Sequence, residues 1–404
     1  MRLSIHMMVL NGARVVERAL RPFAKLDAEV VVVDTGSTDG TPEAVQRLCE
    51  ATFPAELGRE SRLRCRIAAR LTHGSHPGLF FKDSASSWQT DMPGPFTGGP
   101  ILRDWAAARN IGLDACHGDY ILKLDADDEI VEEAGKILDA LQFLDSHPGT
   151  DFLMCPYEIM RTPTESDHLY GASDKDRIET ITMYDRIWRN RPAIRFAQPI
   201  HEYLDSKGFR PDGMPNWFMV AQGLRFRDWR DSPGNGVRLS HRNYKVFMRE
   251  YERLAAAKAE ISPIFLLSTI GEVTDANPNL ALSLLRMARE RNPSLEKDFS
   301  YHLSLGKACD RSGLDQHALE AFREAEVLAP HSASARLALG FCLFDSGADR
   351  KEWAGHLEAG IAEAGARSGF NVDHRDLERA ESMLKEHRDI PALTESIKKS
   401  SSMG

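Results

Sequence analysis

The chain has 404 residues, of which 42% are hydrophobic and 27% are charged, and its formal net charge is −9. This length allows two or three domains, and this composition excludes disordered and collagen-like proteins. No run approaches the roughly 18 to 20 apolar residues that cross a bilayer, and the start lacks the features of a signal peptide. The six cysteines show no CxxC spacing, so we expect free thiols in the cytoplasm and no zinc site.

The first third of the chain alternates between strand and helix patterns. Residues 3–9 and 29–33 are apolar and rich in β-formers, whereas residues 14–26 have helical spacing. A helix should begin at Thr41, with Thr41 as its N-cap and Pro42 at its first position. Further helices are expected at 104–115 and 132–144, and further strands at 120–124, 152–157, 186–188 and 217–226. This order predicts a parallel sheet with right-handed crossovers.

From residue 244 onward the pattern is helical and contains an internal repeat. The positions that recur in the same order and spacing are Ala281, Leu285, Ala288 and Pro293, and then Ala318, Phe322, Ala325 and Pro330. Small residues where two helices touch, with a proline ending each unit, are typical of tetratricopeptide repeats. A third unit begins at 339–340 and departs from the pattern after Gly347. An unrelated helical bundle is the alternative.

These patterns predict three parts of the chain. Residues 1–243 should form an α/β domain, in which 54–100 has little periodicity and is expected to be an irregular insertion with one strand. Residues 244–385 should form the helical repeat domain, and residues 386–404 a C-terminal tail.

One candidate site follows the second predicted strand. Asp34 ends that strand and leads into a turn rich in Gly, Ser and Thr, and ligands of open α/β sheets bind at the carboxyl ends of strands. A carboxylate there can accept hydrogen bonds from a uracil or ribose, and Gly36 and Gly40 allow close approach of the backbone. The alternative is that Asp34 and Thr41 only cap the next helix.

A second candidate site is an acidic cluster. The strand at 120–124 runs into Asp125, Asp127, Asp128 and Glu129, and carboxylates this close repel one another unless a cation lies among them. Mg²⁺ or Mn²⁺ would suit such oxygen ligands and would also hold a diphosphate. The alternative is an acidic turn at a helix start, which applies best to Asp128 and Glu129.

Two further motifs supply complementary chemistry. Arg109 lies in the helix before the acidic strand and can pair with a phosphate or with the acidic cluster. His201 is a candidate metal ligand, and the adjacent Glu202 is a candidate general base. Taken alone, each of these motifs is also explained by a structural role.

The order of these motifs resembles the family-two inverting glycosyltransferases of the GT-A fold. The matching segments are VVVDTGSTDGT (31–41), WAAARNIGL (105–113), GDYILKLDADDEI (118–130) and IHEYL (200–204). The resemblance is strongest to bacterial and phage members that carry tetratricopeptide repeats behind the catalytic domain. It implies a Rossmann-like, nucleotide-sugar-binding GT-A domain followed by an all-α repeat domain.

For the donor pocket, the resemblance implies that Asp34 contacts the nucleotide base, while Ser37 and Asp39 shape the pocket around it. Arg109 would neutralise the diphosphate. The family's Asn-Glu-Glu after the first strand is Asn-Gly-Ala here, beginning at Asn11, which would change the contacts made to the base.

For the reacting centre, Asp125 and Asp127 resemble the family's DxD pair, with Asp125 nearer the ribose and Asp127 on the metal. His201 would be a third metal ligand. Glu202 would be the base that deprotonates the acceptor, and Asp128 is the competing candidate.

The resemblance implies a metal-dependent inverting transferase that moves a sugar from a nucleoside-diphosphate sugar, expected to be a UDP-sugar, to an acceptor hydroxyl or thiol. The acceptor could be a peptide or protein held by the repeats, a saccharide, or modified phage DNA held by the basic stretch 185–250 with its tryptophans Trp188, Trp217 and Trp229. A homodimer through the helical domain is an open alternative to a monomer. Two other functions remain open, a non-catalytic scaffold with a degenerate transferase domain and a nucleotidyltransferase.

Overall fold

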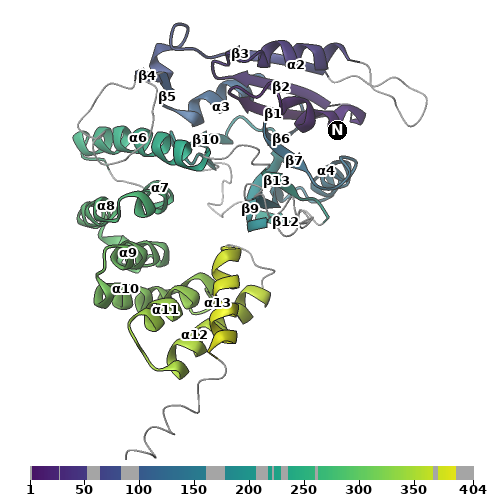
Figure 1. Cartoon of the computed structure of the whole chain (residues 1–404). Helices are drawn as coiled ribbons and strands as arrows, with labels where there is room; N and C mark the ends of the chain where they lie inside the picture. The colour runs from purple at the N-terminus through teal and green to yellow at the C-terminus, as the bar shows by residue number, and fades with distance from the viewer. Residues whose placement is uncertain are drawn as a thin grey trace, which may run out of the picture. The chain divides into compact units, whose positions relative to one another are not determined.

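The computed structural model divides into two compact units, Met1–Ala259 and Glu260–Gly404. The residues that it describes are 2–26, 28–51, 64–82, 100–160, 178–205, 217–220, 223–228, 235–259, 263–366 and 372–387. Figure 1 shows the strands in the first unit and a helical second unit. The division falls after the expected boundary at 243/244, because helix α6 (Asn235–Ala256) belongs to the first unit, where the Arg242 guanidinium lies 4.2 Å from the Trp105 ring.

The first unit is built on a mixed sheet in the order β3-β2-β1-β6-β9-β8-β13-β7, with β12 paired to β8. Strands β3, β2, β1 and β6 are parallel, and β9 runs antiparallel to both β6 and β8. The strands are β1 (Leu3–Val9), β2 (Ala28–Asp34), β3 (Arg64–Arg70), β6 (Tyr120–Asp125), β7 (Asp128–Ile130), β8 (Thr150–Met160), β9 (Ile178–Arg189), β12 (Trp217–Val220) and β13 (Phe226–Asp228). The expected α/β class and its parallel core are therefore confirmed, although the second half of the sheet is mixed.

Alternate residues of the buried strands face two different helical layers. Val30 and Val32 of β2 pack in one cluster with α1 (Val16–Leu20), α2 (Thr41–Glu50) and α4 (Lys136–Ser146). Val31 and Val33 pack instead in clusters that include α3 (Trp105–Asp114). A run of β-branched residues is buried on both faces in this way, which is why it lacks polar alternation.

Glycine brings α3 close to the sheet. A Cβ at Gly112 would lie 2.3 Å from Nε2 of His6 on β1 and 2.7 Å from a methyl group of Val33 on β2. Only a residue without a side chain fits between the helix and the sheet at this point. This close approach sets the position of Arg109, one turn earlier on the same helix.

Two local expectations are corrected. Residues 64–70 form β3, which pairs along β2 from Glu29 to Asp34, so part of the range expected to be an irregular insertion belongs to the main sheet. Its arginines and half-buried small residues concealed a strand that, among the described strands, pairs only with β2. Helix α2 begins at Thr41 but its N-cap is Gly40, with a φ of 86°, because the Thr41 hydroxyl bonds to Asp39 instead of capping the helix.

Shorter elements complete the first unit. They are the 3₁₀ segments η1 (Arg21–Lys25) and η2 (Pro77–Leu79), and the two ribbons β4 (Phe80–Lys82) with β5 (Pro100–Leu102) and β10 (Arg195–Ala197) with β11 (Tyr203–Asp205). Ribbon β10–β11 is tied to α3 because the Asn110 side chain bonds to both the N–H and the C=O of Phe196.

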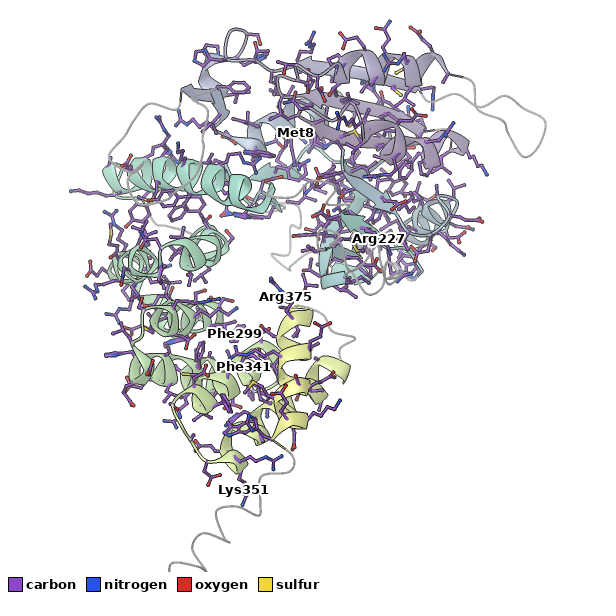
Figure 2. All side chains as sticks on the ribbon, viewed as in Figure 1. Met8, Arg227, Phe299, Phe341, Lys351 and Arg375 are labelled. Atoms are coloured by element: carbon purple, nitrogen blue, oxygen red, sulfur yellow. The ribbon has the colours of Figure 1, made fainter. Side chains whose placement is uncertain are left out.

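The second unit is helical throughout its described residues. Its elements are α7 (Pro263–Ala276), α8 (Pro278–Arg291), η5 (Pro293–Lys297), α9 (Phe299–Arg311), α10 (Asp315–Leu328), α11 (Ala333–Asp345), α12 (Arg350–Ala366) and α13 (His374–Glu386). The repeated Ala281 and Ala318 are both fully buried. The core of the later helices includes Phe341, labelled in Figure 2. The expected tail 386–404 lies outside the described residues from 388 onward.

The small residues of the repeat are explained by contacts between paired helices. A Cβ at Gly306 of α9 would lie 2.4 Å from the Phe322 ring of α10, and one at Gly340 of α11 would lie 2.6 Å from the Leu357 side chain of α12. The third unit therefore keeps the packing of the second beyond Gly347, where the sequence pattern was expected to be lost.

Replacing Gly306 by Ala should destabilise the helical unit by about 1–3 kcal/mol, because the added methyl group overlaps a buried ring. Gly355→Ala is a matched control, since no atom lies within 4 Å of that Cβ inside α12, and it should be neutral or stabilise by up to about 1 kcal/mol. Denaturant unfolding of both variants measures the difference. Equal stabilities would contradict the helix contact described here.

Among the described helices, none combines the length and apolar character that a membrane crossing requires.

Candidate functional site

The carboxyl ends of three parallel strands bring the predicted residues together. The register aligns Val9 of β1 with Asp34 of β2, and Met8 of β1 with Asp125 of β6. Asp34 and Asp125 therefore lie at the same edge of the sheet, on either side of β1. In open α/β sheets this edge is where ligands bind.

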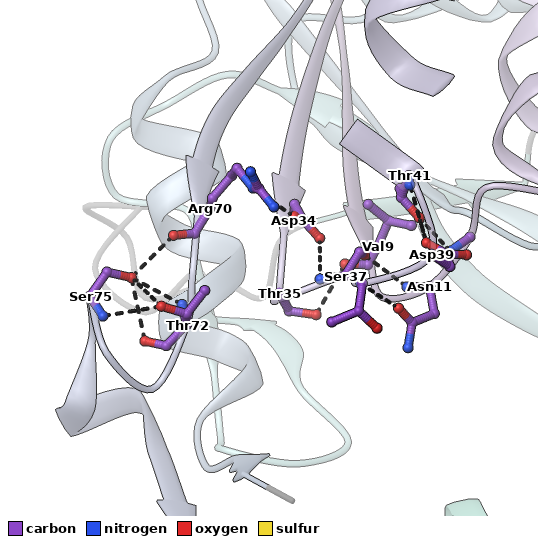
Figure 3. Close-up of polar contacts among 12 residues, drawn as sticks. Val9, Asn11, Asp34, Thr35, Ser37, Asp39, Thr41, Arg70, Thr72 and Ser75 are labelled. Atoms are coloured by element: carbon purple, nitrogen blue, oxygen red, sulfur yellow. Dashed lines mark hydrogen bonds and ion pairs between the residues drawn. The ribbon is translucent and has the colours of Figure 1, made fainter. Parts of the chain in front are cut away.

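Asp34 is almost completely buried and holds a second residue in place. Its Oδ1 accepts a hydrogen bond from the Ser37 N–H at 2.9 Å, and its Oδ2 lies 3.3 Å from Nε of Arg70 at the end of β3 (Figure 3). The Asp34 side chain is only 1% exposed, whereas that of Arg70 is 55% exposed. Arg70, which the sequence analysis did not identify, is thus the member of the pair that reaches solvent.

The turn after β3 fixes the backbone next to Arg70. The Ser75 hydroxyl donates to the carbonyl of Arg70 at 3.3 Å, and the Ser75 N–H donates to the Thr72 hydroxyl at 3.1 Å (Figure 3). The Leu71 N–H donates to the carbonyl of Asp34 at 2.7 Å. These hydrogen bonds hold the ends of β2 and β3 together at the edge of the sheet where Asp34 and Arg70 lie.

The other predicted pocket residues link the loops after β1 and β2. The Asn11 side chain accepts from the Thr38 N–H at 2.9 Å, and the Asn11 N–H donates to the Ser37 hydroxyl at 2.8 Å (Figure 3). Asp39 accepts from the Ala13 N–H at 3.0 Å. Although burial opposes the change, hydrogen bonds from Thr41 and Ala13 lower the pKa of Asp39. Asn11, Ser37 and Asp39 therefore hold the two loops to each other.

Arg109 is the centre of the second group of residues. Its Nε donates to Glu202 at 2.5 Å, and its Nη2 donates to Asp125 at 2.8 Å. The Arg109 side chain is 4% exposed, and its Nη1 is buried with no hydrogen-bond partner among the residues that the structure describes. A buried, unpaired N–H group on a charged side chain is costly, and an anionic ligand would satisfy it.

Two more cations surround Asp125. Nζ of Lys123 lies 3.9 Å and Nη1 of Arg186 lies 4.0 Å from its Oδ2. Although burial opposes the change, the charges of Arg109, Lys123 and Arg186 lower the pKa of Asp125, which is ionised at neutral pH. Lys123 and Arg186 were not predicted from the sequence to belong to the site. Lys123 was visible as a charged residue inside an otherwise apolar strand.

Asp128 belongs to a fully buried network. Its oxygens accept from the Asp125 N–H at 2.7 Å, the Tyr157 hydroxyl at 2.7 Å and the Arg186 Nη1 at 2.6 Å. The Arg186 guanidinium also lies 4.4 Å from the centre of the Tyr157 ring. With no exposed area and three donors, Asp128 stabilises the turn after β6 and has no access to an acceptor.

Asp127 differs from both neighbours. It is exposed, and it lies next to the carboxylates of Asp125, Asp128 and Asp228. Desolvation by the protein atoms around the carboxylate, and then repulsion from these three carboxylates, raise the pKa of Asp127 to about 7. A carboxylate that resists ionisation for this reason is a natural ligand for a divalent cation, which would relieve the repulsion.

Glu202 and His201 lie in a loop with an unusual backbone. His201 has a φ of 51° and Gln198 a φ of 71°, both in the left-handed region. Although burial opposes the change, Arg109 and Lys123 lower the pKa of Glu202, whose side chain is 9% exposed. The described side chains contain no group of three placed to hold a metal, so His201 does not complete a ligand set with Asp125 and Asp127 here.

Several arginines of the basic stretch 185–250 form ion pairs within the first unit. Among its described residues, its ion pairs include Arg186–Asp128, Arg195–Asp114, Arg225–Glu158 and Arg227–Glu158. Arg227 is labelled in Figure 2. Trp188 is buried, while the Trp217 side chain and Trp229 lie outside the described residues. These four arginines are held in pairs within the first unit, and the prediction that the stretch binds phage DNA is not tested by them.

Comparison with known proteins identifies a family segment at this site. Residues 100–200 match the model of glycosyl transferase family 2, which covers Arg109, Asp125, Asp127 and Asp128. A TPR repeat-containing protein of Synechococcus elongatus is 28% identical over 221 residues, which are 54% of this chain and 40% of that protein. The chain thus matches less than half the length of this relative.

Two solved structures give weaker likenesses, one over most of the chain and one over less than a third of it. S. aureus TarS 1–349 in complex with UDP-GlcNAc is 17% identical, with a TM-score of 0.37, over 86% of this chain and 93% of that one. The Sgt2 TPR domain from Aspergillus fumigatus is 25% identical, with a TM-score of 0.25, over 30% of this chain and 79% of that one.

Proposed function

We propose that this chain, which carries a glycosyltransferase family 2 domain in front of TPR-like helices, transfers a sugar from a nucleoside-diphosphate sugar to a hydroxyl or thiol of an acceptor. The observation that carries the proposal is the buried, unpaired Nη1 of Arg109 beside Lys123 and Arg186. A diphosphate is the anionic group of a nucleotide sugar, and arginine binds phosphate oxygens with charge-assisted hydrogen bonds.

The Asp34–Arg70 pair supports a site for the nucleotide base. Arg70 is exposed and oriented by the buried Asp34 carboxylate, so it can offer N–H groups to the carbonyl oxygens of a uracil. This chemistry favours a UDP-sugar as donor. The loops linked by Asn11, Ser37 and Asp39 would keep this pocket in shape before the donor binds.

A divalent cation at Asp127 remains a prediction, because the described side chains form no group of three metal ligands there. Desolvation and, after it, the charges of Asp128, Asp228 and Asp125 raise the pKa of Asp127, so a cation near these carboxylates would relieve part of this cost. Mn²⁺ or Mg²⁺ would be held by Asp127 and Asp125, and the predicted third ligand, His201, is not grouped with them in the structure. When bound, such a cation would supply positive charge opposite the diphosphate.

We propose Glu202 as the base in preference to Asp128, whose carboxylate has no exposed area and accepts three hydrogen bonds. Arg109 now holds Glu202 ionised and weakly basic. A diphosphate that draws Arg109 toward itself would weaken this ion pair and raise the pKa of Glu202. Glu202 would then take the acceptor proton as the acceptor atom bonds to the anomeric carbon, the bond to the diphosphate breaks, and the configuration inverts. Arg109 and Lys123 would stabilise the departing charge.

Thermal unfolding with UDP and Mn²⁺ tests donor binding. A ligand at one hundred times its Kd stabilises the folded state by about 2.7 kcal/mol, so the melting temperature should rise measurably. Arg70→Ala should weaken UDP binding about tenfold, because the exposed contact to the base is lost. Arg64→Ala, at the other end of the same strand, is the matched control and should bind UDP normally.

If UDP and the other nucleoside diphosphates all fail to shift the melting temperature, the transferase proposal fails and the non-catalytic scaffold becomes the better hypothesis. If UDP raised the melting temperature of Arg70→Ala as much as that of wild type, the donor site would stand but Arg70 would not contact the base.

A further inference from the structure

The loop that carries the proposed base Glu202 also carries a glutamine. The last residue pair of ribbon β10–β11 is Ala197 with Tyr203, so residues 198–202 form the loop between the two strands. Gln198 and Glu202 directly follow this pair, one on each strand. Residues at matching positions on the two strands of a hairpin lie side by side, so Gln198 is placed next to Glu202.

Helix α3 holds this loop in position. The Trp105 N–H donates to the carbonyl of Pro199 at 2.9 Å, and Nε of Arg109 donates to Glu202 at 2.5 Å. One of these contacts is made by the residue that follows Gln198, and the other by the residue opposite it. The loop therefore keeps a defined place beside the guanidinium that is proposed to bind the diphosphate.

Gln198 itself carries two unfavourable features in the folded protein. Its side-chain Oε1 and Nε2 are both buried, and neither has a hydrogen-bond partner among the residues that the structure describes. Its φ of 71° lies in the left-handed region, which a residue with a side chain rarely adopts. An unpaired buried amide and a strained backbone both cost free energy, and such features are concentrated where a protein contacts a ligand.

The chemistry of the amide limits the kind of group that would satisfy it. The Gln198 oxygen accepts a hydrogen bond, whereas its nitrogen donates. A diphosphate that is ionised offers only acceptors, so it would leave the oxygen unpaired. A hydroxyl both donates and accepts. Two neighbouring hydroxyls of a sugar ring would therefore satisfy both atoms of one amide.

The position of Gln198 brings the transferred sugar within its reach. In the proposed reaction the anomeric carbon lies between the diphosphate bound by Arg109 and the base Glu202, and the sugar ring extends from that carbon. The uracil is assigned elsewhere, to the Asp34–Arg70 pair at the ends of β2 and β3.

We propose that the Gln198 amide binds two neighbouring hydroxyls of the transferred sugar, with Nε2 donating to one and Oε1 accepting from the other. The loop position beside Glu202 and the two unpaired atoms carry this inference. It rests on the proposed sugar transfer and adds the residue that recognises the sugar. Gln198 thus selects among UDP-sugars by the orientation of these hydroxyls.

Gln198→Leu tests the inference, because leucine is similar in size and has no polar side-chain atoms. The ligand-free variant should melt at the same temperature as wild type or higher, since an unpaired buried amide has been removed. Titration calorimetry then measures binding of UDP, UDP-glucose, UDP-galactose and UDP-N-acetylglucosamine. The variant should bind the UDP-sugar that wild type prefers about ten- to a hundredfold more weakly. The affinity for UDP, which has no sugar, should change by about twofold at most.

Donors that lack one hydroxyl identify the groups that Gln198 binds. Two neighbouring monodeoxy forms of the preferred UDP-sugar should bind wild type more weakly than the parent does, but should bind Gln198→Leu as well as the parent does. Gln142→Leu replaces an exposed glutamine of α4 and is the matched control. It should keep the wild-type preference among the donors.

The possible failures are distinguishable. A Gln198→Leu protein that melts clearly below wild type would show that Gln198 supports the fold. A variant in which only the KM for the acceptor rises would place the amide on the acceptor. Either result, or an unchanged preference for the UDP-sugar over UDP, overturns this inference and leaves the donor proposal standing. If wild type binds neither UDP nor any UDP-sugar, the sugar-transfer proposal fails and this inference fails with it.

Discussion

Replacing Arg109 by Met should destabilise the first unit by about 3–5 kcal/mol and abolish sugar transfer, with kcat/KM reduced by at least ~10³-fold. The substitution leaves Glu202 and Asp125 without the cation that neutralises both of them, and the Arg109 and Glu202 side chains are 4% and 9% exposed. It also removes the donor proposed to bind the diphosphate. Denaturant unfolding and a donor-turnover assay measure the two effects.

The pH dependence of the same variant gives a second readout. Asp125 and Glu202 have lowered pKa values in the folded protein, so they add stability above their unfolded values of about 4, and this stability is lost as the pH falls through the folded values. Arg109→Met should lose this contribution, so its acid sensitivity below pH ~4 should be smaller than that of wild type.

A matched control separates this buried pair from ordinary surface pairs. Arg195→Ala breaks the pair with Asp114, whose side chains are 37% and 66% exposed, and should cost at most about 1 kcal/mol. If Arg109→Met is as stable as Arg195→Ala, the central role of Arg109 is wrong. If Arg109→Met were as stable as wild type but inactive, Arg109 would act in sugar transfer and not in stabilising the fold.

Asp127→Asn should lower turnover ~10²- to 10³-fold while leaving the cation-free protein at least as stable as wild type. The amide cannot supply a carboxylate to a cation, but it removes the repulsion with Asp125, Asp128 and Asp228. Glu129→Gln, two positions further on, is the control and should keep its turnover. Stability and activity that fall together would show that Asp127 supports the fold.

Asp127 should also make cation binding depend on pH. Its pKa of about 7 in the folded protein exceeds the usual ~3.9, so stability of the cation-free protein falls as the pH rises between these values. Protons compete with the cation, and the apparent Mn²⁺ affinity should fall up to about tenfold for each pH unit below 7. Affinity that is flat between pH 5 and 8 would contradict Asp127 as the ligand.

Much of the fold was accessible from sequence because several segments are buried on one or both faces. The run of valines in β2 is compatible only with a buried strand, and the spacing of apolar residues in α3 only with a helix. Other helix bounds were less accurate: the helix expected at 14–26 divides into α1 and η1, and that expected at 132–144 begins only at Lys136. Edge strand β3 was missed because exposed arginines interrupt its apolar pattern.

Site residues that are adjacent in the sequence could be predicted. Residues that only the fold brings together, from distant parts of the chain, could not. Asp125, Asp127 and Asp128 were visible as a cluster, but their differing environments depend on Arg186, which comes from a strand more than fifty residues away. Arg70 could not be assigned to Asp34 without the register of β2 and β3. Asp128 and Asp127 show that neighbouring carboxylates can have opposite burial.

The position of β3 at the end of the described sheet order has a consequence for the behaviour of the folded chain in concentrated solution. An edge strand presents unpaired backbone groups that can recruit a strand of another molecule. Arg64, Arg66 and Arg70 place exposed positive charges along this strand. A second copy approaching edge to edge would meet the same bulky charged side chains, two of them already paired with Glu29 and Asp34, so this border of the sheet is expected to disfavour edge-to-edge pairing.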